Sequence, residues 1–151
     1  MQLYVLGFAG CLFAALTWGA APAAFSHKRH ETLKIPCVNC HAEAMKAERA
    51  GFPEVEKCLV CHKRDGDGRA GLPGEVLDHI PSQRLYNLPD FVFFSHARHG
   101  AAKVECRSCH GDVAARDVLA VEHPPTMKAC IACHRERKAA VGCTTCHELG
   151  Q

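Results

Sequence analysis

Hydrophobic positions along this chain are concentrated near the N-terminus and scattered in short runs elsewhere. Residues 3–24 carry no charged side chain, and a helix of this length would extend about 33 Å, enough to cross a bilayer core. Downstream, "FVFF" at 91–94 predicts a short strand or an apolar lid over a buried group. Short helices are expected at 42–50, 25–30 and 94–99, and the segment 63–76, with five Gly or Pro residues, predicts turns and a linker.

The uncharged N-terminal segment has three interpretations. As a membrane anchor over residues 3–24, it would place Trp18 near the membrane interface. As a cleaved signal peptide, it would use the small residues 21–23 as its cleavage site. As a lipoprotein signal, it would carry the lipid on Cys11. Each interpretation puts the remaining chain outside the cytoplasm, and we expect a periplasmic protein that is membrane-anchored.

Composition narrows the class of protein. The 151 residues include 11 Cys and 11 His, which is far above ordinary usage. Cysteine at this density is typical of a secreted disulfide scaffold or of a metal or cofactor framework. The net charge is +2 with acidic and basic residues interspersed, so no basic patch indicates nucleic-acid binding.

One motif, Cys-x-x-Cys-His, occurs five times, at 37–41, 58–62, 106–110, 130–134 and 143–147. This spacing allows two thioether bonds to the vinyl groups of one haem, with the adjoining His as proximal iron ligand. The motifs therefore predict five c-type haems. The attaching cysteines are Cys37, Cys40, Cys58, Cys61, Cys106, Cys109, Cys130, Cys133, Cys143 and Cys146, and the proximal ligands are His41, His62, His110, His134 and His147.

Three other uses of paired cysteines fit less well. Zinc ribbons do not require a His after every second Cys. Redox disulfides of the Cys-x-x-Cys type are typical of a βαβ context, which this chain lacks. Iron–sulfur clusters prefer four cysteines each and would leave the motif histidines unused.

The remaining histidines are distributed in a repeated pattern. "FSHKRH" at 25–30 recurs as "FSHARH" at 94–99, each shortly before a haem motif. We therefore expect an N-terminal segment 1–24, a dihaem module with its linker at 25–75, and a trihaem module at 76–151. The six spare histidines are His27, His30, His79, His96, His99 and His123.

The order Phe-Ser-His-x-x-His and then Cys-x-x-Cys-His resembles the class III multihaem cytochromes c, over most of residues 25–147. The resemblance implies a small, mostly irregular fold with short α-helices, organised around covalent haems. It also implies that the first His of each pair ligates the nearest iron and the second ligates a later one. The implied distal–proximal pairs are His27–His41, His30–His62, His96–His110, His99–His134 and His123–His147.

The segment 84–99, together with "CRSCHGDV" and "MKACIACHRE", also resembles the pentahaem subunits of quinol-oxidising complexes such as alternative complex III. Many members of that group have His where this chain has Tyr86. His79 could take the place of that ligand, and Met127 is a second alternative for a distal ligand, because Met precedes this haem motif in that group. The same resemblance implies redox partners within a membrane complex.

The predicted function is electron transfer, because two axial histidines close an iron to substrate. With its haems the chain would have a net charge of about −3 when oxidised and about −8 when reduced. Haem faces would supply much of the buried apolar surface, so we expect no stable fold without them. The alternatives are a nitrite reductase-like multihaem enzyme, which needs an open iron, and a repeating structural unit of a larger haem assembly.

Overall fold

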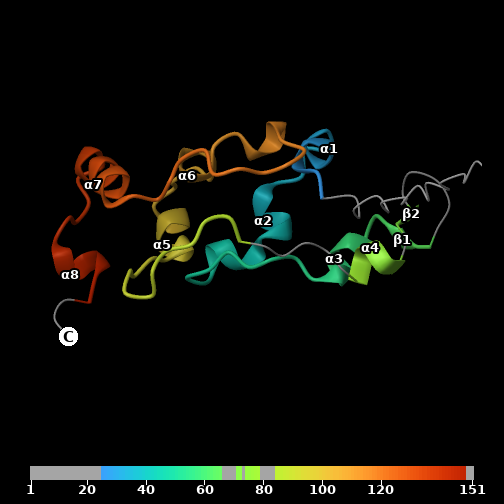
Figure 1. Cartoon of the computed structure of the whole chain (residues 1–151), viewed down its shortest axis with the longest axis horizontal. Coiled ribbons are helices and arrows are strands. Elements are labelled where there is room, and N and C mark those ends of the chain that lie inside the picture. The colour runs from blue at the N-terminus through green and yellow to red at the C-terminus, as the bar shows by residue number, and fades with distance from the viewer. Residues whose placement is uncertain (1–24, 66–70, 73, 79–83, 149–151) are drawn as a thin grey trace, which may run out of the picture.

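The computed structural model describes residues 25–65, 71–72, 74–78 and 84–148, which form short helices joined by irregular segments (Figure 1). This confirms the prediction of a mostly irregular, weakly helical fold. The predicted anchor segment, Cys11 and His79 lie outside the described residues. The elements are α1 (His27–Glu31), α2 (Cys37–Cys40), η1 (Ala42–Met45), α3 (Val55–Leu59), β1 (Lys63–Arg64), β2 (Gly71–Leu72), α4 (Gly74–Asp78), α5 (His96–Ala101), α6 (Arg107–His110), η2 (Val113–Ala115), α7 (Met127–Glu136) and α8 (Cys143–Cys146).

The elements follow one another along an elongated molecule (Figure 1). Helices α7 and α8 lie at one end, α5 and α6 come next, α2 occupies the middle, and α1, α3 and α4 lie toward the other end with the two strands. No helix among the described residues combines the length and the apolar character that a membrane span requires.

The protein core is small. Leu77 of α4 is 0% exposed, and it is the one fully buried hydrophobic side chain within the described ranges. Several large apolar side chains are instead exposed, among them Phe91 at 58% and Phe93 at 55%. Packing of side chains against one another within the chain therefore buries little apolar surface in this fold.

The predicted linker contains more structure than its composition suggests. Strand β1 pairs with β2 in parallel, with Lys63 opposite Gly71, and α4 begins at Gly74. The Asp65 carboxylate accepts a hydrogen bond from the Gly74 backbone N–H at 2.7 Å. This bond fixes a carboxylate at the first turn of α4, where N–H groups have no partner within the helix.

The predicted helix over 42–50 ends early. Only η1 at Ala42–Met45 is helical, because the carbonyls that follow are used by another element. The carbonyl of Ala47 accepts from the Ala97 N–H at 3.0 Å, and that of Glu48 accepts from the His96 N–H at 3.1 Å. Segment 46–48 leaves the helix and satisfies the free N–H groups at the start of α5.

A corresponding contact joins α1 to the second half of the chain. The Lys28 N–H donates to the carbonyl of Arg116 at 3.0 Å, just after η2. The Ser26 hydroxyl donates to Asp117 at 2.6 Å, and Lys28 lies 3.7 Å from the same carboxylate. The two helices that carry histidine pairs therefore dock reciprocally. α1 docks at η2, which follows the motif at 106–110, and α5 docks at η1, which follows the motif at 37–41.

Candidate metal centres

Each Cys-x-x-Cys-His motif forms about one helical turn. In four of the motifs the His backbone N–H donates to the carbonyl of the first Cys at 2.9–3.0 Å, and the remaining motif lies inside α7. Residues i, i+3 and i+4 of a helix share one face, so both thiols and the imidazole are presented to the same side. None of the ten motif cysteines, all within the described residues, forms a disulfide.

Four of the five predicted histidine pairs face each other as rings. In two pairs the ring planes are nearly parallel, with interplanar angles of 8° and 9°, and in the other two they are tilted at 58° and 46°. The ring centroids are 6.4 Å apart for His27–His41, 6.1 Å for His30–His62, 6.3 Å for His96–His110 and 6.0 Å for His99–His134.

These separations fit one metal ion between two imidazoles. A metal about 2 Å from each Nε2 atom places the two ring centroids roughly 6 Å apart. Aromatic rings in direct contact lie about 4.5–7 Å apart, so the recurrence of nearly the same separation in all four pairs is what favours a shared metal. The residues present therefore fit a six-coordinate haem iron with two axial histidines at each of these four centres.

The tautomer of five of these histidines is fixed by backbone carbonyls. A carbonyl oxygen can only accept, so a bonded Nδ1 carries the proton and Nε2 keeps its lone pair for a metal. Nδ1 of each donates at 2.7–2.9 Å. The bonds run from His30 to the carbonyl of Ser26, from His41 to that of Gly51, from His96 to that of Glu48, from His99 to that of Ser95 and from His134 to that of Ala140.

Two further histidines have a lowered pKa. For His27 the first cause is burial, followed by the nearby His41 and His30. For His110 it is again burial, followed by His96 and His41. A lowered pKa keeps the imidazole neutral, which is the form that binds a metal.

The whole Phe-Ser-His-x-x-His repeat contributes to the centres, and sequence reasoning assigned a role only to its histidines. In the second copy, Phe94 stacks on His99 at 4.6 Å and meets His96 edge-on at 4.8 Å. Ser95 caps α5 by accepting from the Arg98 N–H at 3.3 Å, while its carbonyl accepts from His99. The first copy has the same contacts, with Phe25, Ser26, His27, Arg29 and His30. The repetition of Phe-Ser was the signal that could have revealed this.

The fifth centre is assembled differently. The rings of His123 and His147 do not contact each other in the described part of the chain, so their pairing stays a prediction. Val92 forms an isolated antiparallel bridge with His147, and the Phe91 ring lies 5.9 Å from the His147 ring. The "FVFF" segment is thus an extended strand-like cover of this motif. Met127, the other candidate, is 65% exposed at the start of α7.

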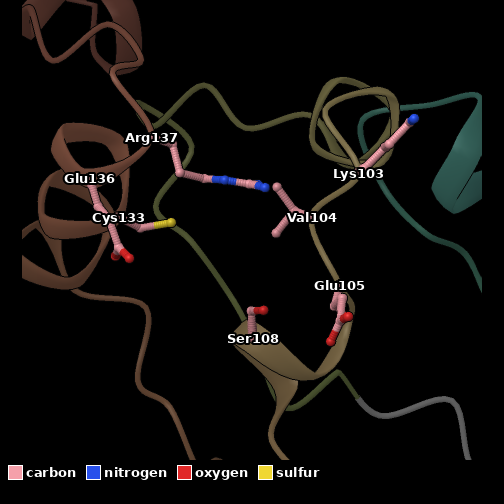
Figure 2. A pocket seen from close by; sticks show the side chains of 7 residues that line it. All are labelled: Lys103, Val104, Glu105, Ser108, Cys133, Glu136 and Arg137. Atoms are coloured by element: carbon pink, nitrogen blue, oxygen red, sulfur yellow. The ribbon is translucent and has the colours of Figure 1, made fainter.

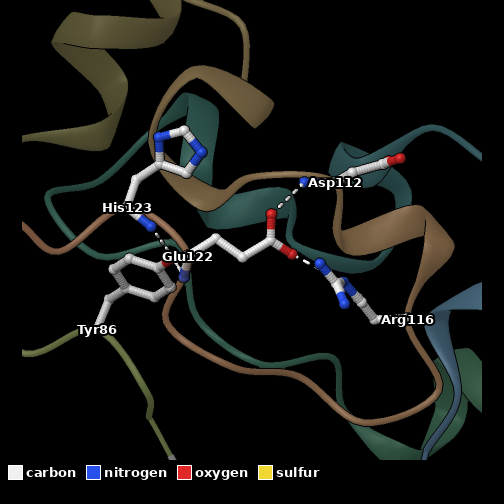
Figure 3. A network of polar contacts seen from close by, with 5 residues as sticks. All are labelled: Tyr86, Asp112, Arg116, Glu122 and His123. Carbon is white, nitrogen blue, oxygen red and sulfur yellow. Dashed lines mark hydrogen bonds and ion pairs between the residues drawn. The ribbon is translucent and has the colours of Figure 1, made fainter.

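Tyr86 links the third and fifth centres through a polar network (Figure 3). Its ring meets that of His110 edge-on at 4.7 Å. Its hydroxyl accepts from the backbone N–H of Glu122 at 3.1 Å and of His123 at 3.5 Å. Tyr86 therefore positions both a proximal histidine and the segment that carries a candidate distal one.

The Glu122 carboxylate completes this network (Figure 3). It accepts from the Asp112 N–H at 3.2 Å and from Arg116 Nε at 2.8 Å. These two partners, in that order, hold the pKa of Glu122 below its usual value. Gly111 has a φ of +72°, and a Cβ atom there would collide with the Glu122 side chain. Glycine after His110 thus allows Glu122 to pack behind the third motif.

Thiols of different motifs lie close together. The pKa of four thiols is raised, first by burial and next by a thiol of another motif. These pairs are Cys58 with Cys40, Cys106 with Cys37, Cys109 with Cys133, and Cys130 with Cys146.

A cavity of about 420 Å³ lies between α6 and α7 (Figure 2). Cys133 points its sulfur toward the cavity from α7, and Ser108 lines it from the third motif. Arg137 extends across it toward Val104 (Figure 2). The attaching cysteine and the guanidinium group are what a thioether bond and a haem propionate require, while Glu105 and Glu136 add negative charge to the same lining.

The comparisons agree with this chemistry. Residues 15–84 match the class III cytochrome C family, and residues 92–148 match the family of cytochrome c7 and related cytochrome c. The two matched segments together span most of the chain.

Two relatives from Nitratidesulfovibrio vulgaris (strain Hildenborough) are similar to this chain. One is a menaquinone reductase, multiheme cytochrome c subunit, 28% identical over 84% of this chain and 76% of the relative. The other is a high-molecular-weight cytochrome c, 24% identical over 74% of this chain, which spans only 26% of that longer relative. With its repeated attachment motifs and facing imidazoles, the chain is built from a class III cytochrome c segment and a cytochrome c7 segment, two families of multihaem cytochromes c.

Proposed function

We propose that this chain is a pentahaem c-type cytochrome that passes electrons between redox partners at the outer face of the cytoplasmic membrane. All five Cys-x-x-Cys-His motifs would hold a haem through their two cysteines and the following His. The proposed distal ligands are His27, His30, His96, His99 and His123, on the proximal partners given above. Its partners would be other subunits of a membrane complex or separate redox proteins.

The observation that carries this proposal is the set of four facing imidazole pairs at 6.0–6.4 Å. When bound, haem iron supplies one-electron oxidation and reduction. The histidine pairs would occupy both axial positions and leave none for a substrate. Backbone carbonyls hold several of the rings through Nδ1, so the ligands keep their orientation when the charge at the iron changes.

The class of complex is suggested by the relative that is a menaquinone reductase subunit. Its match covers 84% of this chain and includes both halves of the motif array. A quinone-linked respiratory complex is therefore the partner we propose. Co-purification from detergent-solubilised membranes, followed by mass spectrometry of the associated chains, tests this assignment.

Haem content and spin state test the electron-transfer function itself. We expect an intact mass that exceeds the polypeptide by five haems and a pyridine haemochrome assay that gives five per chain. We expect near-infrared magnetic circular dichroism to show low-spin iron with at least four bis-histidine centres. Fewer than five haems would contradict the motif assignment. A large high-spin population would favour the multihaem enzyme instead.

A further inference from the structure

The first two haem motifs adjoin each other through α1. His27 and His30 lie on that helix and face His41 and His62, so α1 joins the first centre to the second. A cavity of about 320 Å³ is lined by Cys40 and by residues 52–54, which lead into α3. The Cys40 thiol is also close enough to interact electrostatically with that of Cys58.

The first motif also adjoins the third. Each of these two motifs is followed closely by the segment on which the histidine helix of the other half docks, and the Cys37 thiol lies near that of Cys106. The hydrogen bonds of α5 to segment 47–48 and of α1 to Arg116 hold the two halves together around this point. In Figure 1, α2 accordingly comes next after α5 and α6 along the molecule.

The third motif leads to the fourth and the fourth to the fifth. The cavity in Figure 2 is shared by Ser108 of the third motif and Cys133 of the fourth. α5 joins the same two centres, since His96 faces His110 and His99 faces His134. Helices α7 and α8, which carry the fourth and fifth motifs, lie next to each other at one end of the molecule (Figure 1).

From these contacts we infer that the haem-binding motifs are arranged in space in the order 58–62, 37–41, 106–110, 130–134, 143–147. The first two motifs are exchanged relative to the chain. An approximate two-fold relation explains this order, because the first and third motifs, the second and fourth motifs, and the helices α1 and α5 have corresponding positions and contacts. The fifth motif extends one end only.

This inference rests on the proposed haem content. It adds which two centres lie at the ends of the array, where redox partners would dock. Electrons that cross the whole array would enter and leave at its two end centres. The ends of the array are the centres of His62, beside α3 and α4, and of His147, covered by Phe91. The centre of His41, which belongs to the first motif in the chain, would be internal and would have a neighbouring centre on each side.

The order is tested by proton NMR on the full chain in detergent, with all irons reduced and diamagnetic. Each haem is assigned through contacts from its thioether protons to the differing residues inside its motif, such as Val38, Val60 and Ile131. We expect nuclear Overhauser contacts between the haem on Cys37 and Cys40 and the haem on Cys106 and Cys109. We expect none between the haem of the second motif and that of the third.

Contacts between the second and third haems, with none between the first and third, would overturn the inferred order. A haemochrome assay on the same sample separates this from a failure of the proposed function. A sample with five haems and the wrong contacts rejects the order alone, whereas a sample with missing haems rejects the proposed function. The contact between the haems of the third and fourth motifs serves as the internal control, because both orders predict it.

Discussion

At the scale of single residues, the Phe-Ser-His-x-x-His repeat is a complete device for presenting two imidazoles. Serine caps the helix through its hydroxyl and orients the second His through its carbonyl, while the preceding Phe packs on both rings. The four facing pairs were expected from the resemblance to the class III cytochromes c, whose order of histidine pairs and attachment motifs this chain repeats. The sequence could not predict the arrangement at His147, because that centre depends on a long-range bridge to Val92.

Substitution of the two histidines of α5 should damage different centres. His96→Ala should open the haem on Cys106 and Cys109, and His99→Ala the haem on Cys130 and Cys133, because each ring faces a different proximal His. Losing an axial imidazole moves an iron toward high spin and changes its potential. Assigned haem methyl signals in NMR spectra of each variant identify the affected iron. If both variants opened the same haem, the predicted pairing would be wrong.

Tyr86 allows a hydroxyl effect and a ring effect to be separated. Tyr86→Phe removes the acceptor for the Glu122 and His123 N–H groups and should lower the free energy of unfolding by about 1 kcal/mol. It keeps the ring beside His110, so the potential of that haem should change little. Tyr86→Leu should alter both quantities. Denaturant unfolding and a redox titration followed by NMR measure them, and an equal shift of potential in both variants would contradict the role of the ring.

At the scale of elements, the two helices with histidine pairs dock reciprocally. Helix propensity favoured a helix over 42–50, but the carbonyls of Ala47 and Glu48 serve α5 instead. This competition between local and long-range hydrogen bonds is invisible in a single sequence. The reciprocal contact of α1, through Ser26 and Asp117, spans 91 residues of the chain and was likewise outside the reach of sequence reasoning.

The contact of Asp117 should make stability depend on pH. The Ser26 hydroxyl, and after it Lys28 and Arg29, hold the pKa of this carboxylate below its usual value of 3.8. A pKa lowered by folding stabilises the protein above the unfolded-state pKa, and this contribution is lost as pH falls through the folded-state pKa. Asp117→Asn should therefore reduce stability at neutral pH and flatten its decline below about pH 4.

Thermal unfolding of the holoprotein as a function of pH measures this effect. Glu43→Gln is the matched control, since it removes a carboxylate that lies 3.9 Å from Lys46 on the exposed surface. The control should leave the docking of α1 unchanged. A pH profile of Asp117→Asn that parallels the wild-type profile would show that the carboxylate does not hold α1 in place.

At the scale of the whole molecule, the haem sites themselves would form the centre of the fold. Within the described residues Leu77 is the one fully buried hydrophobic side chain, and the cavities beside Cys40 and Cys133 lie where haems would attach. Composition alone indicated this dependence on cofactor. The spatial order of the motifs needed the structure, because it arises from the docking of two halves that are similar in sequence.

The last prediction follows from this small core. A chain produced in the cytoplasm, without the machinery that attaches c-type haem, should remain unfolded. The entropic cost of ordering the chain exceeds the free energy gained by burying its few apolar side chains. Far-ultraviolet circular dichroism should show little helix, and thermal melting should show no cooperative transition. The matched sample is the same chain matured in the periplasm with its haems. A cooperative transition in the haem-free chain would mean that the protein core is sufficient, and that haems are inserted into a fold that already exists.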